Sequence, residues 1–256
     1  MKQRSRGRPP KYSAEEVRLK LLQAARETLR RQGPGCGLDP ITLDEAIAEA
    51  DVPRGGAYRL WQHDVLTPQL AFRVAVQLDI LRRVGMGAPA VAAKLKETYG
   101  EFEEYADSSD PEDREWAFRT VLRIVANESF EKLDESRNWR IYRALRSNVI
   151  AKANPREAAI EAVRRGEEAQ IDAYAQLYDE VAEVFGVTIR EPFTVREFAA
   201  AAFALNEGIA SRVSGGFRRR GIPRKTGREG EEEAWTLFAI GLEALANQFF
   251  ELDFSA

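Results

Sequence analysis

Three side chains, Arg54, Tyr58 and Arg59, have the types and the spacing to form hydrogen bonds with nucleic acid. On a helix Arg54 and Tyr58 are neighbours four residues apart, and Arg59 lies beside them. A guanidinium donates two parallel hydrogen bonds to a guanine edge or holds a phosphate, and a tyrosine hydroxyl usually donates to phosphate. The pattern therefore predicts that one face of a helix binds nucleic acid.

The segment that carries these residues, about 42–61, is predicted to form two short helices joined by a tight turn. Thr42 and Glu45 have the spacing of a capping box, in which a hydroxyl and a carboxylate each satisfy a free backbone N–H. Asp51 tolerates the left-handed conformation of a turn, and Pro53 suits the first turn of the second helix. The apolar residues recur at helical spacing: Leu43, Ala46, Ile47 and Ala50, then Ala57, Leu60 and Trp61.

Such a pair of helices is typical of a helix-turn-helix, whose second helix can lie in the major groove of DNA. The alternative is a plain helical hairpin in an all-helical core, with a solvated basic face. Gly55 and Gly56 bear on this choice, because glycine costs roughly 1 kcal/mol relative to alanine inside a helix. Some other need should outweigh that cost, and close approach of the backbone to DNA is one candidate.

Charge is divided unevenly along the chain, although the net charge is only -3. Residues 1–63 hold 12 Lys and Arg against 8 Asp and Glu, a balance of +4. Residues 64–256 hold 26 against 33, a balance of -7. A basic amino-terminal module on an acidic body is the layout expected when one end of a protein meets phosphate.

The first twelve residues form a basic arm, which we expect to be disordered when free. Within it Arg6-Gly7-Arg8-Pro9 resembles the core of an AT-hook, which enters the narrow minor groove of A·T-rich DNA. Lys11 belongs to the same run of cations. Contact with DNA is the favoured interpretation of Arg6, Arg8 and Lys11, and a solubilising tail is the alternative.

Composition excludes several classes of protein. Hydrophobic residues make up 44% and charged residues 31% of the 256, an ordinary globular balance. No apolar run reaches the roughly 18 residues of a membrane span, and no signal core is present, so we expect a cytoplasmic protein. A single cysteine, Cys36, and a single histidine, His63, leave no basis for a disulfide, a metal site or an imidazole base. No cofactor is expected.

The amino-terminal segment resembles the DNA-binding domain of TetR-type transcriptional regulators, over roughly the first quarter of the chain. Ser13 and Glu16 begin its first helix, to about Gln32, with a second capping box. The matching residues are Ala24, Ala25, Gly33, Thr42, Ile47, Ala48, Ala50, Val52, Gly55, Tyr58 and Trp61, the last in place of phenylalanine. The departures are Asp51 for the turn glycine, Pro53 for the capping serine, Gly56 for a common threonine and Asp64 for a lysine.

The resemblance implies an all-α protein with a DNA-binding domain at 13–66 and a larger regulatory and dimerisation domain at 67–256. It implies a homodimer on a palindromic operator, acting as a repressor that a small-molecule effector releases. The residues that it places facing DNA are Thr42, Arg54, Gly56, Tyr58 and Arg59. His63 follows the second helix and either meets phosphate or is simply exposed.

The rest of the chain is predicted to be helical, at about 67–83, 90–106, 110–133, 138–153, 154–185 and 194–213, with a final helix up to residue 250. A short extension at 187–189 is the only strand expected. The basic stretch 216–230 is interpreted as a solvated loop. Neither internal repeats nor a phosphate-binding loop are found in the sequence.

The two carboxyl-terminal helices are strongly apolar, which is typical of either buried core or a homodimer interface. The resemblance favours the interface, for which the candidates are Phe198, Ala202, Leu205, Ile209, Trp235, Phe238, Leu242 and Phe249. Aromatic residues with polar tips are common in ligand pockets and commoner still in cores. Because the resemblance implies an effector cavity, Trp116, Trp139 and Tyr142 are the hypothesised lining.

Two other classes remain open. An enzyme would have to rely on paired carboxylates, and no acidic pair stands out from solvated helix faces, so we do not expect one. A helical protein-interaction module is the other alternative. Salt-dependent binding to duplex DNA separates a regulator from both.

Overall fold

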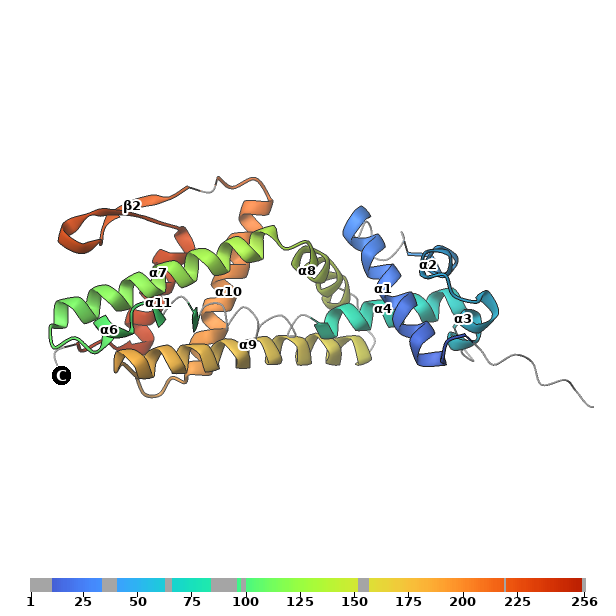
Figure 1. Ribbon diagram of the computed structural model, residues 1–256, viewed down its shortest axis with the longest axis horizontal. Helices are drawn as coiled ribbons and strands as arrows, with labels where there is room; N and C mark the ends of the chain where they lie inside the picture. The colour runs from blue at the N-terminus through green and yellow to red at the C-terminus, as the bar shows by residue number, and fades with distance from the viewer. Residues whose placement is uncertain are drawn as a thin grey trace, which may run out of the picture. The chain divides into compact units, whose positions relative to one another are not determined.

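The computed structural model describes residues 11–33, 41–62, 66–83, 96–97, 100–151, 157–218 and 220–254. Within these ranges the fold is all-α, as predicted (Figure 1). The helices are α1 (Ala14–Gln32), α2 (Leu43–Ala50), α3 (Arg54–Leu60), α4 (Pro68–Arg83), α6 (Glu103–Ala106), α7 (Pro111–Glu135), α8 (Arg137–Ile150), α9 (Glu157–Phe185), α10 (Val195–Ser214) and α11 (Leu237–Phe249). In two small antiparallel sheets, β1 (Thr188–Ile189) pairs with β4 (Phe250–Glu251), and β2 (Ile222–Lys225) pairs with β3 (Glu232–Trp235).

The chain divides into two compact units. The first contains Met1–Arg82 and Arg137–Val163, so that α4 and α8 belong to the same unit as α1, α2 and α3. The second contains Arg83–Ser136 and Arg164–Ala256. Three short helices alone bury little surface, so the additional helices of the first unit supply the support that such a small bundle needs.

The core of the first unit lies where α1 covers α2 and α3. Leu21 and Leu29 of α1 have no accessible surface, and neither do Ala57 of α3 and Phe72 of α4. The capping box predicted for α1 is complete, since Ser13 accepts from the Glu16 amide and Glu16 accepts from the Ser13 amide. Fully burying each large apolar side chain stabilises the unit by about 1.5–3 kcal/mol.

The second unit has its core between α7, α9, α10 and α11. Phe198 on α10 packs edge to face against Tyr178 of α9, with ring centroids 4.8 Å apart. It also packs against Phe250 of β4, at 4.9 Å. β4 pairs with β1, and Ile189 lies opposite Phe250, which confirms the short extension predicted at 187–189.

The basic stretch after α10 is not the solvated loop that was predicted; it forms a β-hairpin in which Ile222 lies opposite Trp235. Arg224 reaches Glu243 of α11 at 2.5 Å, and Glu233 reaches Arg123 of α7 at 2.6 Å. Trp235 is fully buried on β3, whereas the sequence had assigned it to the final helix. That helix begins later, at Leu237, capped by Thr236.

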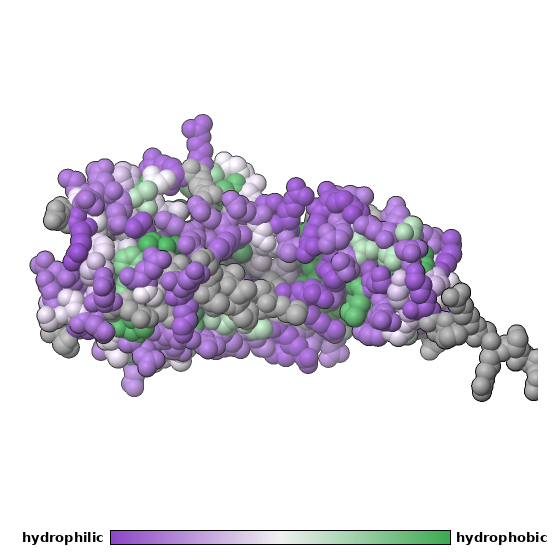
Figure 2. Space-filling model, viewed as in Figure 1, coloured by the Kyte–Doolittle hydropathy of each residue, from purple (hydrophilic) through white to green (hydrophobic). Residues whose placement is uncertain are grey.

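The other predicted helices agree with α4, α7 and α8 to within a few residues. Of the predicted helix 90–106, residues 90–95, 98 and 99 lie outside the described residues, and Glu103–Ala106 is helical as α6. Residues 154–156, at the start of the helix predicted from 154, also lie outside the described residues. In the part of the chain that the structure describes, no helix is both long and apolar enough to cross a membrane. Hydrophilic side chains cover most of the face seen in Figure 2, and apolar ones form small separate patches there.

Candidate nucleic-acid interface

The predicted pair of helices and turn is present as α2, Asp51–Pro53 and α3. Asp51 adopts the left-handed conformation, with φ 49° and ψ 52°, and its amide donates to the carbonyl of Ile47. Val52 is buried and thereby anchors the turn. Pro53 lies one position earlier than predicted, as the residue that precedes α3. The turn therefore follows from local chemistry: α2 ends on a residue that tolerates positive φ, and proline fixes the entry to α3.

The start of α2 is held by its cap and by α4. Thr42 accepts from the Glu45 amide at 3.2 Å, and its hydroxyl donates to the Glu45 carboxylate at 2.8 Å. The Gln69 side chain accepts from the Leu43 amide at 2.7 Å and donates to the Ile41 carbonyl at 2.8 Å. Because the Thr42 hydroxyl donates its single proton to Glu45, it can donate to phosphate only if that hydrogen bond breaks.

The inner face of α3 fixes the helix to the first unit. Ala57 is fully buried, and the Trp61 ring lies 5.3 Å from the ring of Phe72 on α4. Leu60 is half-buried beside them. As predicted, these residues form the underside of α3, so that Arg54, Gly55 and Arg59 are exposed on its other side.

Two outward side chains of α3, Arg54 and Tyr58, share one acid, Asp44 of α2, which the sequence analysis did not single out. The Tyr58 hydroxyl donates to Asp44 Oδ1 at 2.9 Å. Arg54 Nη2 lies 3.1 Å from the same oxygen, and the guanidinium covers the Tyr58 ring at 5.4 Å. Arg59 donates to the carbonyl of Gly55 at 3.1 Å. Asp44 was missed because this contact depends on how α2 crosses α3, which no spacing within either helix encodes.

Neither glycine of α3 is required by packing within the chain. A Cβ added to Gly55 or Gly56 would meet nothing within 4 Å, and neither residue has a positive φ. Most residues could therefore occupy these two positions without strain. The open space lies on the same short helix as the exposed Arg54 and Arg59, so α3 offers a smooth backbone surface between two cations.

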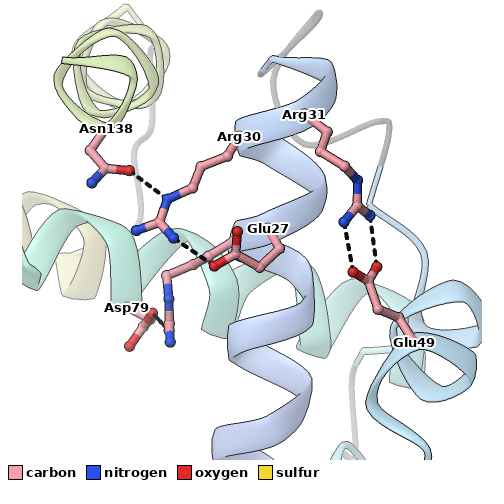
Figure 3. A network of polar contacts seen from close by, with 7 residues as sticks. Glu27, Arg30, Arg31, Glu49, Asp79 and Asn138 are labelled. Carbon is pink, nitrogen blue, oxygen red and sulfur yellow. Dashed lines mark hydrogen bonds and ion pairs between the residues drawn. The ribbon is translucent and has the colours of Figure 1, made fainter.

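The arginines at the end of α1 are occupied within the first unit (Figure 3). Arg31 donates to both carboxylate oxygens of Glu49, at 2.7 and 2.8 Å, and this pairing holds the pKa of Glu49 below its ordinary value. Arg26 contacts Asp79 of α4 at 2.5 Å. Arg30 contacts Glu27 at 2.6 Å and donates to Asn138 of α8 at 3.0 Å. These cations hold helices together.

Other cations of the first unit are directed outward. Lys11 and Lys20 each lie 5.0 Å from the centre of the Tyr12 ring, and both are exposed. The Lys11 ammonium is 3.9 Å from Asp51, too far apart and too exposed for a strong pair. Arg6, Arg8 and His63, which the sequence analysis also assigned to DNA, lie outside the described residues.

The predicted dimer interface needs correction, because the chain itself covers most of it. The buried candidates are Phe198, Ala202, Trp235, Phe238 and Leu242. These belong to the core of the second unit, the alternative that the apolar pattern left open. Leu205, Ile209 and Phe249 are partly buried against that core, and Leu237 at the start of α11 is 45% exposed.

None of the three predicted ligand-binding residues lines the cavity found in the second unit. Trp116 packs against Phe102 and Tyr105, with centroids 5.9 and 5.2 Å away. Trp139 and Tyr142 are buried together on α8, 5.1 Å apart, in the first unit. The cavity lies between α7, α9, α10 and α11 and is lined by Ser129, Tyr174, Tyr178, Ala199, Ala202, Phe203, Asn206 and Phe238.

This cavity is small and uncharged. Its volume is about 10 Å³, the space of roughly one water molecule. The side-chain oxygen of Asn206 is buried and has no hydrogen-bond partner among the described residues. Burial raises the pKa of Tyr174 to about 12 and also raises that of Tyr178, so both hydroxyls stay protonated at neutral pH. No cluster of acids, histidine or cysteine that could hold a metal is found among the described residues.

No family model and no curated protein matches the chain. Among solved structures, a protein of unknown function from Rhodococcus sp. RHA1 is 19% identical, with a TM-score of 0.46, covering 94% of this chain and 96% of its own. A protein from Vibrio parahaemolyticus described as a TetR family transcriptional regulator is 16% identical, with a TM-score of 0.42, covering 92% and 99%.

Proposed function

We propose that the chain is a transcriptional regulator that binds double-stranded DNA through α3. One observation carries the proposal: a short helix anchored by Ala57 and Trp61 exposes Arg54, Arg59 and two glycines with open space above them. A helix with cations on its outer face and little side-chain bulk between them suits the wall of a major groove. Because Arg26, Arg30 and Arg31 are engaged in ion pairs, the exposed cations of the first unit that can meet phosphate include Arg54 and Arg59 of α3, as well as Lys11 and Lys20.

The regulator acts, in this proposal, as a homodimer on a palindromic operator. A single helix-turn-helix reads too few base pairs for useful specificity, and two-fold symmetry doubles the site. Leu237 of α11, which is 45% exposed, supplies apolar surface in the second unit, together with the partly buried Leu205 and Ile209 of α10. These residues, with Phe249, replace the buried candidates as the proposed contact between copies.

The proposal includes release from DNA by a small-molecule effector. The cavity beside Asn206 is the place in the second unit where an uncharged molecule with a hydrogen-bond donor would satisfy a buried acceptor. A molecule larger than water has to displace Phe203, which is half-exposed at the cavity. The effector then lowers operator affinity by binding one of two conformations more tightly, and the protein acts as a repressor.

Selection from random duplex DNA tests the core of the proposal. The full chain is mixed with duplexes that carry a randomised central region, and bound sequences are recovered over several rounds. A palindrome with half-sites about one helical turn apart supports both DNA binding and dimerisation. Enrichment of a single half-site would support DNA binding and contradict the homodimer. No enrichment at low salt contradicts the regulator and favours a protein-interaction module.

The effector site is tested separately by thermal unfolding. A panel of small neutral alcohols, phenols and amides is screened for an increase in Tm, with Asn206→Leu as the matched variant. We expect at least one compound to raise the Tm of the wild type and to weaken its operator binding. The same compound should change neither the Tm nor the operator binding of Asn206→Leu. A compound that stabilises both chains equally binds elsewhere.

A further inference from the structure

We infer that Asp44 sets the hydrogen-bond pattern that α3 presents to DNA, with donors at Arg54 and an acceptor at Tyr58. The DNA site that fits this pattern contains a guanine, and a cytosine or an adenine lies one or two base pairs away from it. The inference rests on the proposed function and names the base chemistry of its site.

Asp44 contacts Arg54 and Tyr58 at the same time. Its Oδ1 accepts from the Tyr58 hydroxyl at 2.9 Å, and its Oδ2 accepts from Arg54 Nη2 at 3.2 Å. The Arg54 guanidinium also lies over the Tyr58 ring, 5.4 Å from its centre. Two flexible side chains are therefore held by a third from another helix, which reduces the rotamer freedom that each would lose on binding.

The bond to Asp44 changes what Tyr58 can offer. A tyrosine hydroxyl has one proton, and here it is donated to the carboxylate, so only the oxygen lone pairs face outward. Phosphate oxygens are acceptors and cannot pair with them. The exocyclic amino groups of cytosine and adenine are donors in the major groove and can. Asp44, whose side chain is 54% exposed, adds a second acceptor beside them.

Arg54 keeps the opposite character. A guanidinium has five N–H donors, and the contact with Asp44 involves Nη2 alone. The second Nη2 hydrogen, together with one on Nη1 or Nε, can donate in parallel to O6 and N7 of guanine. Because Arg54 and Tyr58 are one helical turn apart, roughly 5–6 Å, the two bases that they meet lie about one or two steps of 3.4 Å apart.

Asp44 should therefore lower general affinity and raise discrimination. Its negative charge disfavours every phosphate nearby, whatever the sequence. Its hydrogen bonds favour only the base pair pattern described above. A merely structural acid at the start of α2 would change stability and leave base preference untouched, so base preference is the property to measure.

The test compares Asp44→Ala with Asp51→Asn. Both remove one negative charge from the helix-turn-helix, but Asp51 touches neither Arg54 nor Tyr58, and asparagine tolerates its left-handed backbone. Binding sites are selected for each chain from random duplexes, and Kd is measured on the wild-type site and on the same site with guanine replaced by adenine. Circular dichroism verifies that each variant is folded.

We expect the wild-type site to contain guanine within two base pairs of cytosine or adenine. Asp44→Ala should reduce discrimination against the altered site by about 10-fold and bind unrelated DNA more tightly, whereas Asp51→Asn should gain affinity with discrimination intact. Tyr58→Phe should lose the preference for the amino-bearing base and keep guanine. If the wild type binds DNA and Asp44→Ala discriminates between the two sites as well as the wild type does, the role of Asp44 is contradicted and the proposed function is not. If the wild type binds no duplex, it fails with the proposed function.

Discussion

Replacing both glycines of α3 by alanine should make the protein more stable and a weaker DNA binder. Gly55 and Gly56 are the second and third residues of α3, and a Cβ at either would meet nothing within 4 Å. Each substitution therefore gains helix propensity without a clash, up to about 1 kcal/mol. For two substitutions in a unit of about a hundred residues, this corresponds to an increase in Tm of up to roughly 8–16 °C.

The same methyl groups should interfere with DNA. They project from the face that carries Arg54 and Arg59, where the open space is available to a groove wall or a sugar-phosphate backbone. Even a shift of the backbone by about 1 Å would lengthen hydrogen bonds beyond their useful range. We expect affinity for the selected operator to fall at least about 10-fold, the loss of roughly one good base contact.

Thermal unfolding by circular dichroism and DNA binding by fluorescence anisotropy are measured on the same preparations. Ala48→Gly, at an exposed position of α2, calibrates the cost of a glycine in a neighbouring helix. Increased stability with unchanged DNA affinity would refute close approach of DNA to these glycines. Decreased stability would mean that the added methyl groups clash, and would contradict the open space described around the two glycines.

Three further predictions concern charge and packing. The pKa of Glu49 is lowered because Arg31 donates to it, so its contribution to stability is complete above pH 4.5 and is lost as the pH falls through the lowered pKa. In a curve of Tm against pH, Glu49→Gln should remove that acid-dependent loss of stability. Arg59→Ala should reduce the slope of log K against log salt by about 1, while Arg31→Ala leaves it unchanged, and equal slopes would contradict this division of charge. Trp235→Ala should lower the free energy of unfolding by about 3–5 kcal/mol in urea titration, because a fully buried indole leaves a cavity; a loss below about 1 kcal/mol would mean that the hairpin is not packed as described.

The features that sequence alone predicted are those fixed by neighbouring residues. Ser13 and Glu16 cap α1 through contacts within one turn, and Asp51 has the left-handed conformation that its position requires. The faces of α3 follow from the spacing of Ala57 and Trp61. Each of these depends on a few consecutive residues and on no distant part of the chain.

The features that were missed depend on packing between elements. The hairpin β2–β3 contains Pro223, and its two adjacent cations on β2 lie opposite two adjacent acids on β3. It is held by contacts of Arg224 and Glu233 to helices distant in sequence. Asp44 lies in α2, and nothing in its local pattern distinguishes it from a solvated acid. The apolar stripes of α10 and α11 fit a core and an interface equally well, and the packing of other elements around them, such as α9 and β4 against Phe198, decides which residues are buried.

Binding of duplex DNA to α3 is tested most directly by anisotropy titration of a fluorescent random-sequence duplex at two or more salt concentrations. The wild type and the variant Arg54→Ala/Arg59→Ala are compared, since both side chains are exposed and neither supports the core. The account predicts wild-type binding that weakens linearly in log K against log salt, and a large loss of affinity with an unchanged Tm in the variant. Absence of wild-type binding in dilute salt, or equal binding by the two chains, would contradict it.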